Sequence, residues 1–180
     1  MLCREKMKAQ VYSHEYFMDL ALEEAAVTLA DGEFPVGCVI ALGNKVVASG
    51  GRRDSAGDAP ELEHAEIVAM RRLLRETPGL DPACLTVYST MEPCLMCLGT
   101  LLVNGFRQIV YAYEDVMGGA TDLPLRQLRP LYKNISLAVI GGVRRQQSLA
   151  LFQRFFAGRP LYLRGSLLAE YTMAQPQDSP

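Results

Sequence analysis

The stretch LEHAEIVAM, residues 62–70, is followed further along the chain by a second one, MEPCLMC, residues 91–97. Each stretch contains the start of an apolar helix. His64 lies at the start of the helix in the first stretch, and Cys94 and Cys97 lie at the start of the helix in the second. A strand-like run, residues 85–90, lies between these helices. Right-handed crossovers place two such helices on the same face of a sheet, with their N-termini side by side. The pattern therefore predicts that His64 and Cys94 lie close together.

The rest of the chain continues the alternation of helices and strands. Apolar residues recur at helical spacing over residues 14–30, and two β-rich runs surround Gly43-Asn44, which predicts a hairpin. Further strands are expected within residues 107–113 and 136–142, and a closing helix over residues 144–156. This order of elements predicts an α/β fold in which the later strands are parallel.

Length and composition are those of a soluble globular protein. The chain has 180 residues, 49% of them hydrophobic, and a net charge of −2. We expect one domain over residues 13–157, a flexible N-terminus at 1–12 and a partly disordered extension at 158–180. No apolar run reaches the roughly 18 residues of a membrane span. No signal peptide is recognised, which predicts a cytoplasmic protein. The weak negative charge disfavours a uniformly basic nucleic-acid surface.

The helix starts carry three residues that are typical zinc ligands. His64, Cys94 and Cys97 would supply one nitrogen and two sulfurs, and a helix N-terminus favours the thiolate form of cysteine. The other histidine, His14, lies on the first helix, so no fourth protein ligand is evident. Three ligands with a position left for water are typical of a catalytic rather than a structural zinc site. Either motif alone is less specific, since a histidine can begin a helix and CxxC can be a redox pair.

Glu66 lies two residues beyond His64, in the first turn of the same helix. This spacing is too short for both side chains to chelate one metal comfortably. A carboxylate there could instead accept a proton from a zinc-activated water and pass it to a ring nitrogen or a leaving amine. The sequence therefore predicts that Glu66 is a catalytic proton carrier.

Together, "HAE" and "PCLMC" resemble the signature of the zinc-dependent cytidine and adenosine deaminase superfamily. The order of several strings also resembles bacterial tRNA-specific adenosine deaminases: SHEYFMDLALEEA, FPVGCVI, LEHAEIVAM, STMEPCLMCLGTLL and RQIVYAY. The resemblance covers most of the chain, from about residue 13 to 157. It implies a three-layer α/β/α cytidine-deaminase-like fold with a mixed five-stranded sheet. It also implies one zinc ion per subunit and a homodimer that forms through the cysteine-bearing helix.

The resemblance further implies roles for individual residues. His64, Cys94 and Cys97 would bind zinc, and Glu66 would move protons while water replaces the amine of a base and ammonia leaves. The segments that would line the substrate pocket are Pro35, Val36, Gly37, Glu92 and Pro93.

Two features depart from the pattern of the resembling proteins. After the second strand they usually carry Gly-x-Asn, whose asparagine touches the base or its sugar, whereas this chain reads Gly50-Gly51-Arg52-Arg53. Arg52 would then contact the substrate instead. Carboxylates also gather near the expected pocket mouth, where they would repel phosphate: Asp54, Asp58, Glu61 and Glu63.

Three functions remain open at this point. The string-level resemblance favours a deaminase that converts adenosine to inosine in tRNA. Arg52 and the acidic mouth favour a deaminase of a free base or nucleoside, of guanine, cytosine or adenine type. A catalytically idle zinc-binding partner subunit is the third possibility, although such a subunit would have no use for Glu66.

Overall fold

The computed structural model describes residues 12–55, 61–158 and 161–176. Nearly all of the predicted flexible N-terminus and the predicted mouth residue Asp58 lie outside these ranges. The elements are, in order, α1 (His14–Ala30), β1 (Gly37–Leu42), β2 (Lys45–Gly51), α2 (Ala65–Glu76), η1 (Pro82–Cys84), β3 (Leu85–Met91), α3 (Leu95–Val103), β4 (Gln108–Tyr113), η2 (Leu125–Gln127), α4 (Pro130–Lys133), β5 (Ala138–Ile140), α5 (Arg145–Ala157) and α6 (Leu167–Ala174).

The five strands form one mixed sheet in the order β2-β1-β3-β4-β5. Strand β1 is antiparallel to both of its neighbours, and β3, β4 and β5 run parallel to one another. The hairpin around Gly43-Asn44 and the parallel arrangement of the later strands are thereby confirmed. In both β2–α2–β3 and β3–α3–β4, a helix connects two parallel strands, as the alternation predicts.

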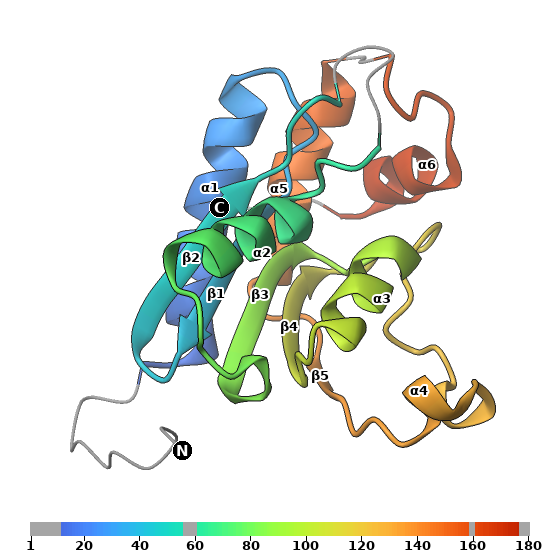
Figure 1. Ribbon diagram of the computed structural model, residues 1–180. Helices are drawn as coiled ribbons and strands as arrows, with labels where there is room; N and C mark the ends of the chain where they lie inside the picture. Colours follow the sequence, from blue (N-terminus) through green and yellow to red (C-terminus); the bar gives the residue numbers. More distant parts are fainter. Residues whose placement is uncertain (1–11, 56–60, 159–160, 177–180) are drawn as a thin grey trace.

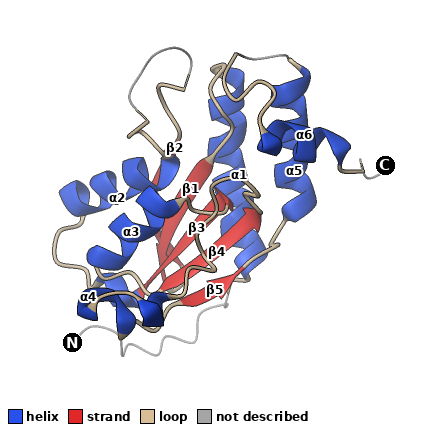
Figure 2. Cartoon of the chain, turned by 90° about the vertical axis from the view of Figure 1, so that its right-hand side faces the viewer, coloured by secondary structure: helices blue, strands red, loops and turns tan. Residues whose placement is uncertain are grey.

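Helices cover both faces of the sheet, which gives the expected three layers (Figure 1, Figure 2). Helices α2 and α3 lie together on one face, and α1 and α5 lie on the other (Figure 2). The N-termini of α2 and α3 therefore meet at the same end of the sheet. This is the arrangement that the two opening motifs predict.

Close contact between α1 and the start of β1 fixes this end of the sheet. A Cβ at Gly37 would overlap the carbonyl oxygen of Ala21 in α1. The Gly37 N–H donates to Thr90 Oγ1 at the end of β3 (3.0 Å). Glycine is thus required where the segment 34–37 enters the sheet beside the N-termini of α2 and α3.

The segment after α5 is part of the folded structure. Leu168 of α6 is only 1% exposed, and Thr172 hydrogen-bonds to Tyr113 at the end of β4 (3.1 Å). Gln153 of α5 donates to the Thr172 carbonyl oxygen (3.2 Å). Sequence patterns do not predict α6, and the proposed boundary at residue 158 stays a prediction. Within the described residues, no helix is long and apolar enough to cross a membrane.

Candidate active site

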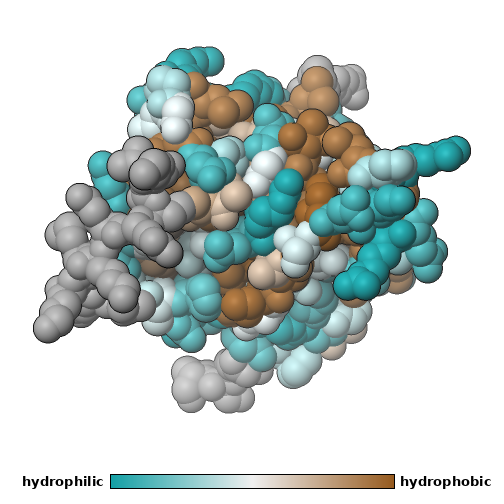
Figure 3. All heavy atoms as spheres, turned by 60° about the horizontal axis from the view of Figure 1, so that its bottom comes forward, coloured by the Kyte–Doolittle hydropathy of each residue, from teal (hydrophilic) through white to brown (hydrophobic). Residues whose placement is uncertain are grey.

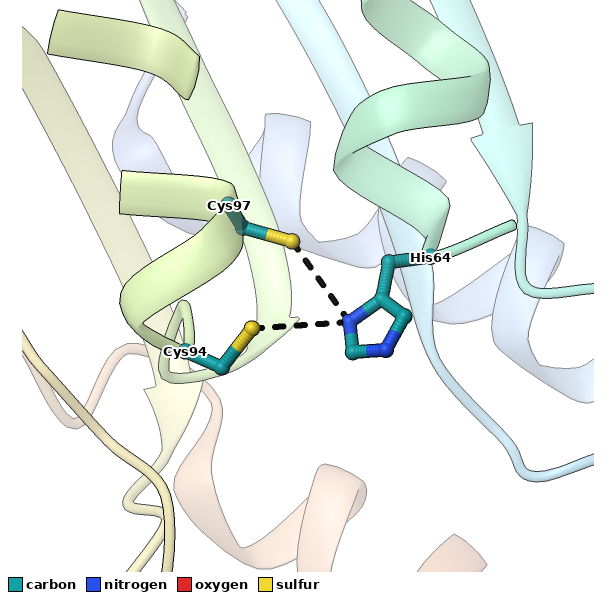
Figure 4. A group of neighbouring side chains, drawn as sticks. All are labelled: His64, Cys94 and Cys97. Atoms are coloured by element: carbon teal, nitrogen blue, oxygen red, sulfur yellow. Dashed lines mark hydrogen bonds between the residues drawn. The ribbon is translucent and has the colours of Figure 1, made fainter. Parts of the chain in front are cut away.

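Three metal-binding side chains converge between the N-termini of α2 and α3 (Figure 4). His64 and Cys94 are the N-cap residues of their helices, and neither side chain caps its own helix. Both backbones are extended there, and Cys97 lies one turn into α3. The His64 Nδ1 atom lies 3.7 Å from the Cys94 sulfur and 3.5 Å from the Cys97 sulfur.

These distances fit one zinc ion. With Zn–S near 2.3 Å and Zn–N near 2.0–2.1 Å, tetrahedral geometry separates nitrogen from sulfur by about 3.6 Å. The three donor atoms all lie within 4.8 Å of one another. Among the described residues, no fourth histidine, cysteine or carboxylate joins this group. One nitrogen, two sulfurs and an open fourth position are the donor set of a catalytic zinc site.

The electrostatics of the two thiols differ strongly. The hydrogen bond from the Cys97 thiol lowers the pKa of Cys94 to about 4, against the opposing effect of burial, and the His64 ring acts in the same direction. The same bond, together with burial, raises the pKa of Cys97. The Cys94 thiol therefore tends to be deprotonated at neutral pH. The Cys97 thiol would lose its proton when a metal ion binds and displaces it.

Glu66 lies beside this group but is not part of it. It occupies the first turn of α2, is 3% exposed, and burial raises the pKa of its carboxyl. Ser89, fully buried in β3, donates to Glu66 Oε1 (3.2 Å), and the Cys97 thiol lies 3.4 Å from Oε2. A carboxyl group held in place and inclined to keep a proton suits general acid–base work.

A cavity of about 180 Å³ opens beside the three ligands. This volume lies well below the roughly 300–1,000 Å³ of pockets that hold drug-sized ligands, so it suits a small ring system. The described residues that line it are Phe34, Val36, Arg52, Glu61, His64, Ala65, Glu66, Met91, Glu92, Cys94, Asp115, Met117, Gly118, Tyr162 and Leu163.

The predicted substrate-binding residues fall into two groups. Val36, Arg52 and Glu92 line the cavity, whereas Pro35, Gly37 and Pro93 lie in the adjoining backbone and do not. The Glu92 carboxylate is occupied by the loop after β4: it accepts the N–H groups of Asp115 (3.2 Å) and Thr121 (3.1 Å). Glu92 therefore shapes the loop that forms one wall of the cavity.

Of the carboxylates expected at the mouth, Glu61 is the described one that lines the cavity. Its carboxylate pairs with Arg52 and lies 3.6 Å from His64 Nε2, on the ring edge away from the thiols. A carboxylate there can fix the orientation of a metal-binding imidazole. Glu63 instead pairs with Arg71 of α2, and Asp54 is exposed outside the cavity.

Arg52 is buried, at 5% exposed, although it carries a charge. Its Nη2 donates to Glu61 and to Tyr162 Oη (2.7 Å), and its guanidinium lies 5.1 Å from the Tyr162 ring centre and 5.8 Å from that of Phe34. Sequence reasoning missed Phe34 and Tyr162 as cavity residues. Tyr162 comes from an irregular segment behind α5 and carries no sequence motif, so no local signal could have located it.

Comparison with known families and proteins agrees with this geometry. Residues 11–113 match the cytidine and deoxycytidylate deaminase zinc-binding region. The chain is 30% identical over 152 residues to a tRNA-specific adenosine deaminase of Agrobacterium fabrum, covering 81% of this chain and 95% of that protein. A tRNA-specific adenosine deaminase of Haemophilus influenzae is also 30% identical, with 81% and 84% covered.

Solved structures share the fold. A tRNA:A34 deaminase, which edits A to I at the wobble position of transfer RNA, superposes with a TM-score of 0.65 at 28% identity, covering 76% of this chain and 98% of that one. A guanine deaminase from Nitrosomonas europaea superposes with a TM-score of 0.66 at 18% identity, covering 84% and 89%. The second likeness is one of fold alone.

Proposed function

The chain belongs to the cytidine and deoxycytidylate deaminase family, hydrolases that act on C–N bonds, and we propose that it converts an amino-substituted nucleobase to the carbonyl form with release of ammonia. One observation carries this proposal. His64, Cys94 and Cys97 converge from two helix starts, and the buried Glu66 lies beside them at a cavity large enough for a small ring system.

In this proposal His64 Nδ1 and the two cysteine sulfurs hold one zinc ion. Zinc, when bound, supplies Lewis-acid activation of water at neutral pH. Glu66 would carry one proton of the attacking water to a ring nitrogen and the second proton, from the hydroxyl then on the carbon, to the departing amine, so that ammonia leaves as the C–N bond breaks and a C=O bond remains. Ser89 keeps the Glu66 carboxyl group in position. Burial raises the pKa of this group, which helps it to hold a proton between accepting and donating it.

Adenosine in tRNA is the first candidate substrate. It is supported by the two curated relatives, which are tRNA-specific adenosine deaminases. Arg126 and Lys133 line one shallow hollow next to α4, and these side chains could contact a phosphate backbone. Cytoplasmic location and a homodimer would accompany this function and remain predictions.

A free base or nucleoside is the second candidate. The resemblance implies an asparagine at the position of Arg52, and Tyr162 from the segment after α5 forms part of the cavity wall. Glu61, Glu92 and Asp115 add carboxylates around the cavity, which disfavours a phosphate close to the reacting base.

Ammonia release tests the proposal. The zinc-loaded protein is offered tRNA and, separately, a panel of bases and nucleosides. Glu66→Gln should lower kcat by about 10²-fold or more, because the proton carrier is lost, while zinc content stays unchanged. Glu63→Gln, which alters a carboxylate paired with Arg71 outside the cavity, is the matched control and should keep its activity. Full turnover by Glu66→Gln would remove its assigned role. A fully zinc-loaded protein that turns over nothing would favour an idle partner subunit.

A further inference from the structure

The buried arginine of the cavity carries an inference about which base the pocket accepts. We propose that Arg52 is the specificity-determining residue, and that it selects aminated bases bearing a ring carbonyl oxygen over aminated bases without one. This inference rests on the proposed function and names the substrate class of the same pocket. Arg52 follows directly on β2, and its N–H donates to the Val36 carbonyl oxygen (2.8 Å), so both residues belong to one wall.

The guanidinium of Arg52 presents only hydrogen-bond donors. Nη2 is engaged by Glu61 and Tyr162, but Nε is buried without any hydrogen-bond partner. A buried donor left unpaired is unfavourable, because it has lost its hydrogen bonds to water without gaining a partner. An asparagine at this position would offer a donor and an acceptor, whereas Arg52 offers donors alone, and its unpaired Nε belongs to a side chain that lines the cavity.

The carboxylates around the cavity already accept hydrogen bonds from the protein, and they cannot donate to a ligand acceptor when ionised. Asp115 accepts the N–H groups of Met117 (3.0 Å) and Gly118 (2.9 Å), and Glu92 is bonded to the loop after β4. Among the described residues that line the cavity, Arg52 is the one lysine or arginine. A ligand acceptor in this pocket therefore finds its strongest charged donor in Arg52.

Arg52 is also held still before a ligand arrives. Glu61 and Tyr162 Oη fix one edge of the guanidinium, and the rings of Phe34 and Tyr162 pack against it. Donors that are ordered in advance do not lose side-chain entropy on binding.

A carbonyl oxygen of the base can accept a hydrogen bond from the guanidinium, whereas an unsubstituted ring carbon cannot. Hydrogen bonds to charged groups contribute about 1.5–3 kcal/mol, which corresponds to roughly 10- to 100-fold in kcat/KM. A site built to bond a substrate group rejects an analogue that lacks the group, because its own polar atoms stay unpaired. The same reasoning disfavours adenine, which has no carbonyl oxygen.

Matched pairs of bases test the inference on the zinc-loaded, full-length protein. Each pair shares the amine that is removed and differs in one carbonyl: guanine with 2-aminopurine, isoguanine with adenine, and cytosine with 4-aminopyrimidine. Because the bases differ in intrinsic reactivity, the measured quantity is how Arg52→Asn changes the kcat/KM ratio within a pair. The ratio should fall by about 10- to 100-fold. Arg53→Asn changes the exposed neighbouring arginine and should leave the ratio unchanged.

Binding measured by calorimetry separates this inference from the proposed function. If the wild type binds the carbonyl-bearing base of a pair more tightly and Arg52→Asn removes that preference, the inference stands even when no base is deaminated. If bases or tRNA are deaminated but Arg52→Asn leaves both the ratio and the binding preference unchanged, the inference is overturned and the proposed function survives. An equal effect of Arg53→Asn, or no selective binding of any base, also overturns it. Zinc content and circular dichroism of each variant exclude a folding defect.

Discussion

Cys94 is one of the three side chains that would hold the metal. Its sulfur lies 3.7 Å from His64 Nδ1, and the lowering of its pKa to about 4 favours the thiolate at neutral pH. We predict that Cys94→Ala abolishes stoichiometric zinc binding, measured by atomic absorption on the purified variant. Cys38→Ala removes a thiol that is buried in β1 and is not part of the three-ligand group, and should keep one zinc per chain. Equal zinc in both variants would contradict the assignment.

Ser89 is a positioning residue, because it acts through Glu66. Without its hydrogen bond, which contributes about 1.5–3 kcal/mol to a charged acceptor, the Glu66 carboxylate is held less firmly. Ser89→Ala should lower kcat by roughly 10-fold and leave both zinc content and KM nearly unchanged. Ser49 of β2 donates to Glu24 of α1, which is not a cavity residue, and Ser49→Ala is therefore the control variant. A loss confined to KM would argue against this role.

At the residue scale, sequence could predict the metal group and the carboxyl beside it. Their residue types and their positions at the starts of two neighbouring helices are enough to predict that these side chains converge. The structure brings His64, Cys94, Cys97 and Glu66 together. Phe34 and Tyr162 could not be predicted as cavity residues. Phe34 lies in the irregular segment before β1 and Tyr162 in the one after α5, and no periodicity encodes how these two segments pack together.

Between elements, an ion pair holds α5 and α6 to the end of β4. Arg145 Nε donates to Glu114 Oε2 (2.8 Å), Tyr171 Oη donates to the other carboxylate oxygen (2.7 Å), and Arg145 Nη2 also bonds Gln175 (3.1 Å). Burial raises the pKa of Glu114, but the hydrogen bonds from Arg145 and Tyr171, with the charge of Arg145, together outweigh it and the pKa is lowered overall. Glu114 follows directly on β4 and precedes Asp115, so this cluster also supports one wall of the cavity.

This ion pair predicts a pH-dependent stability. A carboxyl with a lowered folded-state pKa stabilises the fold above its unfolded pKa, near 4.3, and loses that contribution as the pH falls through the folded value. Urea unfolding should show Glu114→Gln about 1 kcal/mol less stable than wild type at pH 7. The difference should shrink below about pH 4. Glu23→Gln, on the exposed side of α1, should show no such trend. A constant difference across this pH range would contradict the prediction.

The helices and strands themselves were largely predictable. Helical spacing predicts α1, α2 and α5, and short apolar runs predict β1 to β5; each of these elements except the three-residue β5 buries one face or both. The helix α6 escaped prediction: it is short, and it buries only Leu168 and Thr172. Two buried positions are too few to produce a recognisable period.

For the whole molecule, the dimer remains a prediction that surface composition supports. Leu95 and Val103 of α3 are 61% and 58% exposed, on the helix that the resemblance assigns to subunit pairing. Apolar patches are scattered among hydrophilic residues on the face in Figure 3. We predict that sedimentation equilibrium gives a dimer and that Leu95→Glu gives a monomer. Leu131→Glu, at an equally exposed leucine of α4, should remain dimeric. A monomeric wild type would refute the expectation.

At this scale, the parallel later strands and the shared face of α2 and α3 (Figure 2) followed from the alternation of elements and the handedness of crossovers, and the structure confirms them. The three layers and the mixed five-stranded sheet, which the family resemblance implied, are confirmed as well. Substrate choice did not follow. It depends on the cavity wall, where residues from the start of β1, the end of β2 and the segment behind α5 meet. These segments are far apart in sequence, so their side chains constrain one another only in the folded chain.

The position of Tyr162 has a consequence for synthesis on the ribosome. His64, Cys94 and Cys97 are all translated well before Tyr162, which belongs to a segment behind the last strand and α5. A nascent chain could thus capture its metal while the wall that holds Arg52 is still missing. Selectivity among bases would be acquired later than metal binding, once Tyr162 has left the exit tunnel.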